Sequence, residues 1–594
     1  MSHSKELFKS LKENIMKKVK YFILFGLLII LTNSCQDFLE VNPKAIILDS
    51  QLNDPKYVDG FVNAAYAFMP QVGYNGTMNP WVTSVRSDDA YKGGGSLDDQ
   101  VAWYYMEVFS LVNPNILNNN NVWDAAYRGL SRVNTAITAL ENLDESTFPL
   151  KTQRIAEMRF LRGWIYFKLL ERFKWVPMFD ETATTEEIKN IPNRPEGVQD
   201  NLDLWQKVYD DLIFAADNLP ETQVDKGRVN EYAAKSYLIK TLLWMAYPQD
   251  LNNQITAIDL TKLTEALGYC NEIVNSEKYF LCSDYAENFL PQYDNTTPES
   301  IWELQFTIKD GTTNGLKNYG NVLNGPWFSP SSVCCDFHKA SYNLVNAFRV
   351  DANGLPLFDT FNDAEITDKI EYFASNDWDP RLSHTVAIPG YPWKYQINPL
   401  LKYDSTGSRK PAIYGYFHSM KENAPAGCNC VTNQYLGYNS MNQREVRYDE
   451  ILLYQAEILI KLSRPMDALP IINQIRERAS NSTQRLKWED GSYWLNYKCG
   501  QYLPGVNCTW DEDFAWKALV WESRLELAME GRRFFDLVRW GEVKDVMNSF
   551  MEKEGTRYSW YRIGRFNSGR DEYLPIPQIQ IDRAKGVYVQ NPGY

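Results

Sequence analysis

Two stretches of the chain place aromatic rings beside side chains that can form several hydrogen bonds. Residues 71–121 and 281–440 are rich in Gly, Asn and aromatics, in a sequence with 18 Trp and 37 Tyr. Exposed rings can stack on a ligand that has flat apolar faces, and a few polar groups can fix its orientation. The candidates with this chemistry are Trp81, Arg86, Asp88, Trp103, Tyr319, Asn324 and Trp327. The alternative for each residue is packing in the core or anchoring of a loop.

Acidic residues are numerous, so a glycosidase has to be considered. Such an enzyme needs two carboxyl groups about 5–5.5 Å or about 6.5–9.5 Å apart, one of them with a raised pKa. Asp88-Asp89, Asp98-Asp99 and residues 511–513 are candidates only by their number, because solvated and capping acids are the ordinary alternative. The chain has only four histidines and contains no G-x-S-x-G, H-E-x-x-H or P-loop motif. We therefore predict that the protein is not an enzyme.

The sequence predicts no metal or cofactor site. Residues 377–379 and 511–513 could contact a structural calcium ion, but they lack the spacing of an EF-hand. Cys428-Asn-Cys430 lacks the second half of a zinc-binding pattern and has no histidine close by. Disulfides are the alternative for these cysteines, and their pairing cannot be read from the sequence. The net charge of −14 argues against a nucleic-acid partner.

The N-terminal segment has the pattern of a lipoprotein export signal. Lys17, Lys18 and Lys20 precede an apolar run over residues 21–31. This run is too short to cross a bilayer, which takes about 20 residues, but it has the length of a signal-peptide core. The following Leu-Thr-Asn-Ser-Cys35 is similar to a bacterial lipobox, which predicts cleavage before Cys35 and attachment of lipid to its sulfur.

This pattern divides the chain into three parts. We expect residues 1–34 to be a signal peptide, with Met16 as its true start, and residues 35–54 to be a lipidated tether. Residues 55–594 would form a single domain. No later run of 18 apolar residues is present, so we expect a protein that is anchored to a membrane and does not span it.

Apolar residues recur with the helical period of 3.6 along most of the chain. The predicted helices are residues 123–141, 153–171, 201–218, 228–247, 260–276, 445–462, 466–479, 512–530 and 532–541. Each carries one apolar stripe, so a single helical hairpin cannot bury its apolar face, whereas stacked hairpins can. The spacing is not a clean repeat of about 34 residues, so the sequence predicts a TPR-like scaffold from pairing alone. Residues 71–121 and 281–440 interrupt it, and we expect irregular, loop-rich insertions there.

Short motifs are distributed along the chain in a fixed order. They are Cys35-Gln-Asp-Phe-Leu-Glu40, Ser87-Asp88-Asp89, residues 156–167, Val176-Pro177, Gly227-Arg228, Arg447-Tyr448, Glu530-Gly531-Arg532-Arg533, Arg539-Trp540-Gly541, Leu574-Pro575-Ile576-Pro577 and Gln590-Asn591-Pro592-Gly593-Tyr594. Each motif alone is weak evidence. Together and in this order they resemble the SusD/RagB family of nutrient-uptake lipoproteins, over essentially the whole chain after the export signal.

The resemblance implies a mainly α fold, in which a TPR-like scaffold of helical hairpins carries an irregular, loop-rich ligand-binding subdomain. It also implies a lipoprotein of the cell outer membrane that faces the exterior, with a SusC-like TonB-dependent transporter as partner. The implied function is capture of a nutrient, an oligosaccharide or polysaccharide, for that transporter. Capture of a peptide and a structural lid without a ligand of its own are the alternatives.

A sugar ring has apolar CH faces and hydroxyl edges, which decides the roles of the candidate residues. The expected stacking residues are Trp81, Trp103, Tyr319 and Trp327, and the expected hydrogen-bonding residues are Arg86, Asp88 and Asn324. The aromatic candidates lie in stretches without a fixed motif, so the resemblance does not assign them. The motif arginines Arg159, Arg162, Arg532 and Arg539 are expected to form buried or partly buried ion pairs that fix helix packing.

Overall fold

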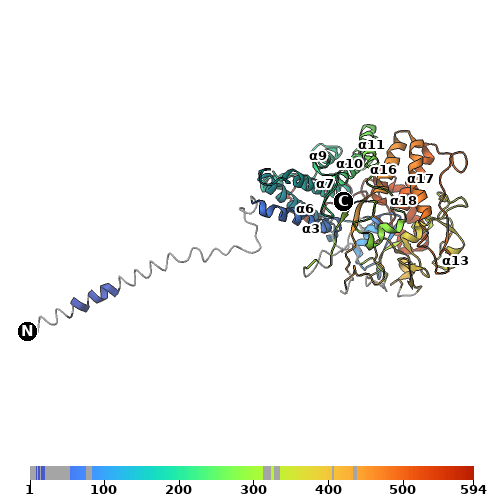
Figure 1. The fold of residues 1–594 in the computed structure, drawn as a ribbon, viewed down its shortest axis with the longest axis horizontal. Coiled ribbons are helices and arrows are strands. Elements are labelled where there is room, and N and C mark those ends of the chain that lie inside the picture. The colour runs from blue at the N-terminus through green and yellow to red at the C-terminus, as the bar shows by residue number, and fades with distance from the viewer. Residues whose placement is uncertain are drawn as a thin grey trace, which may run out of the picture. The chain divides into compact units, whose positions relative to one another are not determined.

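In the computed structural model, the chain separates into Met1–Asp54 and a compact unit, Pro55–Tyr594, which carries all the elements labelled in Figure 1. The structure describes residues 54–74, 83–308, 310–311, 323–326, 335–403, 407–432 and 438–594, together with helical residues between 9 and 20. The predictions for Cys35, Trp81, Tyr319 and Trp327 therefore lie outside the described residues, as do those for most of the export signal and tether.

Antiparallel helices that follow one another in sequence form the first part of the compact unit. They are α3 (Pro55–Tyr74), α6 (Leu117–Glu141), α7 (Lys151–Phe173), α9 (Leu202–Asn218), α10 (Glu231–Ala246) and α11 (Leu260–Asn275). Each of these helices packs against the next one along the chain (Figure 1). Local caps help to define their starts, because Asn230 and Asp259 accept backbone N–H groups at the first turns of α10 and α11. The predicted TPR-like stacking of hairpins is confirmed.

A second group of helices extends the stack. α16 (Tyr448–Lys461) packs against α11, α17 (Pro465–Asn481) and α18 (Glu512–Glu526), while α19 (Arg533–Trp540) packs against α20 (Val543–Arg557). Pro465 stands at the first position of α17, where its missing N–H is not needed, and Asp511 caps α18 by accepting the N–H of Phe514. The acid run at 511–513 thus begins with a capping residue.

Irregular structure and short strands make up most of the remainder. The strands are β1 (Ala90–Gly93), β2 (Ser300–Leu304), β3 (Phe337–Ala340), β4 (Asp377–Trp378), β5 (Val386–Ala387), β6 (Pro392–Trp393), β7 (Gln396–Leu400), β8 (His418–Ser419), β9 (Gln443–Arg447) and β10 (Asn496–Tyr497). The described strands form two-stranded pairs, β1-β3, β2-β9, β4-β10, β5-β8 and β6-β7. The short helices are α5 (Val101–Val108), α8 (Thr185–Asn190), α12 (Tyr342–Ala347), α13 (Ile370–Ala374), α14 (Arg381–Thr385), α15 (Pro411–Tyr414) and α21 (Gln578–Arg583).

Strand β2 joins the irregular part to the helical scaffold. The Trp302 ring meets the rings of Phe160 and Trp164 on α7 edge-on, at centroid distances of 5.0 and 5.5 Å. The Trp164 indole N–H donates to the Tyr237 hydroxyl of α10 at 2.9 Å. All four rings belong to the buried core, so the two kinds of structure share one hydrophobic interior.

The motif arginines form the predicted ion pairs. Arg162 and Arg159 of α7 both bind Asp211 of α9, with the Nε of each guanidinium 2.7 and 2.8 Å from a carboxylate oxygen. Arg532 pairs with Glu450, and Arg539 pairs with Glu457, which ties α19 to α16. Removing one partner of such a pair leaves a buried charge, so the motifs fix the scaffold.

The first insertion is more helical than the sequence predicts. It contains α5, and α6 already begins at Leu117 and includes the run of four asparagines at 118–121. Asn119 and Asn120 are buried there, and the Asn120 amide donates to Asp124 one turn on. These tertiary contacts override the low helix propensity of Asn. Helices α3 and α20 were also absent from the predicted set. None of the helices in the described part of the chain combines the length and apolar content that a membrane crossing requires.

Candidate functional site

The two loop-rich insertions are joined by a strand pair. β1, in the first insertion, runs antiparallel to β3, in the second, with Ala90 opposite Ala340 and Gly93 opposite Phe337. The Gly94 N–H donates to the Asp336 carbonyl at 2.7 Å and extends the junction. Along the chain, residues 75–82 with Trp81 precede β1, and residues 327–334 with Trp327 precede β3.

Described residues that lie before 75–82 and before 312–322 meet at a cavity of about 220 Å³. Met69 and Pro70, near the end of α3, line one side of it, and Leu304 and Gln305, at the end of β2, line another. From these points the chain continues into residues 75–82 and 312–322, which hold Trp81 and Tyr319. The described residues that flank these stretches therefore come together at the β1-β3 pair and at this cavity. We take the β1-β3 pair and this cavity as the candidate site.

Residues 323–326 lie alongside the start of β3, between residues 312–322 and 327–334 of the chain. The Asp336 N–H donates to the Gly325 carbonyl, and the Phe337 N–H donates to the Leu323 carbonyl. Asn324 is fully buried, and its side chain donates to Glu422 at 3.2 Å. Its carbonyl accepts a hydrogen bond from the amide of Asn423. Asn324 thus fastens the segment that leads to Trp327, and its predicted role as a ligand contact stays a prediction.

Arg86 and Asp88 are buried anchors in the structure. The Arg86 guanidinium lies 4.1 Å from the centroid of the Phe534 ring and donates to the Asp571 carbonyl at 2.6 Å, and burial lowers its pKa to about 10. Asp88 binds Arg524 and Arg533 at 3.0 and 3.1 Å. Burial alone would raise the pKa of Asp88, but the two guanidinium groups lower it. Both side chains are at most 3% exposed and anchor the fold, and their predicted role as ligand contacts stays a prediction.

Trp103 is also a core residue. Its side chain is 0% exposed, and its ring meets Phe337 of β3 edge-on at 4.8 Å. Neighbouring side chains cover its ring in this structure, and the predicted stacking role of Trp103 stays a prediction. Its contact with β3 supports the junction between the two insertions.

A buried polar network holds β1 and the loop that follows it. The sequence analysis did not predict this network. The Lys92 N–H and the Tyr561 hydroxyl both donate to one oxygen of Glu107, at 2.9 and 2.8 Å. The Lys92 ammonium donates to the carbonyls of Ser96 and Asp99, which holds the loop after β1. Burial raises the pKa of Glu107 to about 7 and lowers that of Lys92 to about 8. The sequence contains no signal for the contact that closes this network, because Tyr561 lies 454 positions from Glu107.

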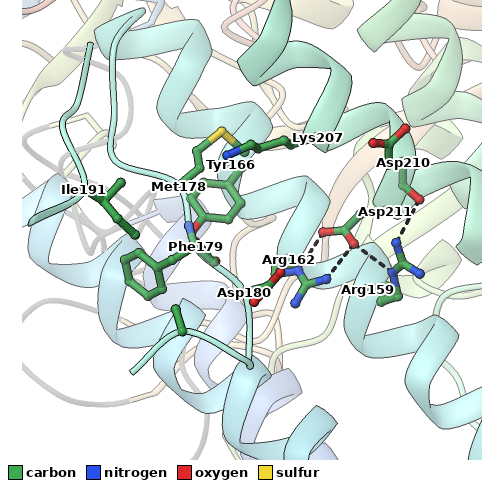
Figure 2. Close-up of a pocket in the computed structure, with 11 residues that line it drawn as sticks. Arg159, Arg162, Tyr166, Met178, Phe179, Asp180, Ile191, Lys207, Asp210 and Asp211 are labelled. Carbon is green, nitrogen blue, oxygen red and sulfur yellow. Dashed lines mark hydrogen bonds and ion pairs between the residues drawn. The ribbon is translucent and has the colours of Figure 1, made fainter. Parts of the chain in front are cut away.

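A larger cavity of about 380 Å³ lies between α7, α9 and the segment that follows α7 (Figure 2). Figure 2 shows Asp211 between Arg159 and Arg162, with Phe179 and Ile191 on the opposite wall. Arg159 and Arg162 in its lining already bind Asp211. None of the predicted ligand residues lines this cavity.

The carboxylates considered for calcium have other partners. Asp379 binds Arg381 at 2.8 Å, and Asp377 binds Lys498 at 2.7 Å. A separate buried group of carboxylates, Glu299, Asp449 and Glu526, is close enough together to hold an ion. Guanidinium groups already compensate it, because Arg447 and Arg478 bind Glu299, Arg447 binds Asp449 and Arg478 binds Glu526. Cys428 and Cys430, the other metal candidates, form a disulfide.

Family models match both halves of the chain. The model of the SusD family matches residues 298–594, and a model described as "Starch-binding associating with outer membrane" matches residues 37–243. The chain belongs to the SusD family. The resemblance based on motifs is thereby confirmed, and the second description suggests association with the outer membrane.

Relatives match over nearly their full lengths. SusD-like protein P25 of Formosa agariphila is 23% identical over 588 residues, which cover 95% of this chain and 97% of that protein. SusD-like protein P38 of the same organism is 25% identical over 571 residues, 92% of this chain and 96% of the relative. These family members differ strongly in sequence while keeping the same length.

Solved structures share the fold. A SusD homolog from Bacteroides thetaiotaomicron superposes with a TM-score of 0.68 at 18% identity, covering 92% of this chain and 99% of the homolog. Surface glycan-binding protein A from the same organism, solved with laminarihexaose, gives 0.62 at 21% identity, covering 90% and 99%. A protein described as a laminarin-binding SusD-like protein gives 0.63 at 22% identity, covering 91% and 100%. The mainly helical, TPR-like fold is that of the family.

Proposed function

We propose that this protein captures an oligosaccharide or polysaccharide at the outer membrane and passes it to a SusC-like TonB-dependent transporter. The carrying observation is that described residues on either side of the stretches with Trp81, Tyr319 and Trp327 meet at the β1-β3 pair and at the cavity between α3 and β2. Rings from such stretches can form one stacking surface for successive sugar units. The glycan ligands named for two structural neighbours support the same class of ligand.

The proposal includes an anchor and a partner. Lipid on the Cys35 sulfur would hold the protein on the membrane, facing the exterior, and residues 36–54 would serve as a tether. A bound glycan then stays close to the transporter, which raises its local concentration there. No catalytic role is proposed.

The test is a screen of the chain from Gln36 onward against an array of glycans, with a peptide library as the parallel arm. Binding to one class of glycan and none to the peptides supports the proposal. Binding only to peptides would replace the glycan with a peptide ligand. A folded sample that binds neither would leave the role of a structural lid. Pull-down of a SusC-like barrel by the full-length lipoprotein tests the partner.

A further inference from the structure

The cavity between α7, α9 and the segment that follows α7 is separate from the candidate site. Its volume of about 380 Å³ falls within the range of about 300–1,000 Å³ that small-ligand sites usually have. None of the described residues of the β1-β3 pair, or of the cavity between α3 and β2, lines it. The ion pairs of Asp211 use only part of the charged groups in its lining. The other groups can meet a ligand that enters from solvent.

One wall of this scaffold cavity is apolar and already in place. It includes Met178, Phe179 and Ile191 (Figure 2). The Phe179 ring stacks on the ring of Tyr127 at a centroid distance of 6.0 Å. The Tyr166 hydroxyl donates to the Phe179 carbonyl at 2.8 Å and accepts the Phe179 N–H at 3.0 Å. An apolar surface that is fixed before binding saves a ligand the cost of ordering it.

Two cationic side chains in the lining have donors to spare. Arg159 donates through Nε to Asp211 and through one terminal nitrogen to the Asp210 carbonyl, so its other terminal nitrogen is left over. Within the described part of the chain, Lys207 makes no hydrogen bond or ion pair through its ammonium group. Figure 2 shows the Lys207 side chain extended from α9 toward the segment that follows α7. Both donors can therefore serve a ligand in the cavity.

Two carboxylates in the lining have acceptors to spare. One oxygen of Asp180 accepts the N–H and the hydroxyl of Thr182, and one oxygen of Asp210 accepts the Gln206 amide at 2.8 Å. The second oxygen of each carboxylate has no bond within the described residues. Burial would raise the pKa of Asp180, but the bonds from Thr182 lower it and Lys207 adds to this effect, so the carboxylate is charged and can accept.

The balance of charge decides which class of ligand fits. Three cationic and three carboxylate side chains line the cavity, and Glu181, outside the lining, also binds Arg162. No net positive charge is left over, so a sulfate or a carboxylate gains no advantage here. Free donors beside free acceptors suit groups that both donate and accept, as hydroxyl groups do. An apolar wall opposite them suits the CH face of a sugar ring.

The main chain of the cavity walls is less suited to a peptide. An extended peptide binds chiefly by pairing its main chain with that of its host. The N–H and the carbonyl of Phe179 are both bonded to Tyr166, and the main chains of α7 and α9 are bonded within each helix. The aromatic residue of the wall and the two helices therefore offer a peptide no main-chain pair.

We propose that the scaffold cavity is a second glycan-binding site, which takes a neutral sugar unit. Phe179 supplies the apolar face, Lys207 and Arg159 donate to hydroxyl oxygens, and the carboxylates of Asp180 and Asp210 accept from hydroxyl groups. The inference rests on the proposed glycan function. It adds a second point of attachment, which holds a long glycan on the protein more tightly than one site alone.

The test uses the chain from Gln36 onward and a neutral trisaccharide cut from the glycan found in the array. We expect the trisaccharide to shift the methyl resonances of Met178 and Ile191 in protein labelled with ¹³C at its methyl groups. Calorimetry with the same trisaccharide should show a second class of site. A sulfated form of the trisaccharide should leave both methyl resonances in place, because the cavity has no positive charge to spare.

Lys207→Met removes a donor, and Asp210→Asn removes the charge of an acceptor. We expect each to weaken binding at this cavity about tenfold, as for one lost hydrogen bond to a charged group, measured from the titration of the Ile191 methyl resonance. Lys189→Met and Asp217→Asn are the matched controls, the same changes at exposed positions outside the lining, and should titrate like the wild type. Thermal unfolding will show that each variant is folded.

Methyl resonances that do not respond to the trisaccharide, or variants that titrate like the wild type, would overturn the second site. A response to peptides in place of the trisaccharide would also overturn it and identify the cavity as a peptide site. Glycan binding on the array leaves the proposed function intact in each of these cases. A wild-type protein that binds no glycan on the array would remove the proposed function, and this assignment with it.

Discussion

Asp88 illustrates how a residue that looks available for a ligand serves the fold. It compensates two guanidinium groups, Arg524 and Arg533, in a site that excludes water. We expect Asp88→Asn to lower the free energy of unfolding by about 3 kcal/mol, because it leaves buried positive charge without its partner. Urea unfolding at pH 7 measures this.

The matched control for Asp88→Asn is Asp98→Asn, the same change at an exposed position a few residues further on. It should alter the free energy of unfolding by less than about 0.5 kcal/mol. Equal effects of the two substitutions would contradict the anchoring role of Asp88.

Glu107 gives the stability a specific pH dependence. Its pKa in the folded state is about 7, above the ordinary value of 4.5. A raised carboxyl pKa means that the folded state prefers the protonated form. The contribution of protonated Glu107 to the free energy of unfolding is therefore complete below pH 4.5 and is lost as the pH rises through 7. We expect Glu107→Gln to stabilise the protein at pH 8 by about 2 kcal/mol, and to have little effect at pH 4. Thermal unfolding of both proteins across this range is the check, and a stabilisation that does not depend on pH would refute it.

At the residue scale, the sequence shows which side chains could bind a ligand or form an ion pair, but it does not show which of these roles each one has. The arginine motifs predicted ion pairs correctly, because a charged residue on the apolar side of a helix needs a partner. Arg86, Asp88 and Trp103 have the chemistry of ligand contacts, yet residues hundreds of positions away bury them.

The β1-β3 pair is the element on which the candidate site depends. Gly93 has a φ of +81°, and a Cβ there would lie 2.1 Å from the Asp336 carbonyl oxygen. We expect Gly93→Ala to lower the free energy of unfolding by more than about 3 kcal/mol, because a backbone clash adds to the strain of positive φ. The variant should also bind glycan more weakly wherever it remains folded. Urea unfolding and a binding titration measure the two effects.

Gly197 provides the matched control, since it has a φ of +80° and nothing within 4 Å of an added Cβ. Gly197→Ala should show only the cost of positive φ, roughly 1–2 kcal/mol, with unchanged glycan affinity. If the two alanine variants behave alike, the close junction at Gly93 does not hold the two insertions together.

At the element scale, the 3.6-residue period of apolar residues and the Pro and Gly residues between the periodic stretches predict the helices of the scaffold well. The predicted helix 201–218 corresponds to α9 (Leu202–Asn218), and the predicted helix 228–247 corresponds to α10 (Glu231–Ala246). The strands of the insertions could not be predicted, because they are two to five residues long and pair across large sequence distances, as β1 does with β3. The Asn run within α6 shows that tertiary contacts can reverse a local preference.

For the whole molecule, membrane attachment should depend on one sulfur atom. We expect Cys35→Ser to move the protein from the membrane fraction to the soluble fraction, changing their ratio more than about tenfold, because the lipid supplies the apolar contact with the bilayer. Fractionation of cells followed by immunoblotting measures this. Cys508→Ser, a half-buried free cysteine, is the control and should stay with the membrane. Retention of Cys35→Ser in the membrane fraction would mean another mode of attachment.

At this scale, an ordered set of weak motifs was enough to identify the family, since the family models cover both halves of the chain. The ligand could not be derived in the same way. The motifs hold the scaffold, whereas the aromatic residues proposed to bind glycan lie in stretches that lack any motif.

The most direct test of the glycan account is a calorimetric titration of the chain from Gln36 onward with the best glycan from the array. It would compare the wild type with Trp81→Ala and Trp327→Ala, and with Trp488→Ala as a partly exposed tryptophan outside the two insertions. We expect the first two variants to lose about tenfold in affinity, as for one stacking contact, and the third to bind like the wild type. Unchanged affinity in both Trp81→Ala and Trp327→Ala would contradict capture of a glycan by the stretches that hold these two residues.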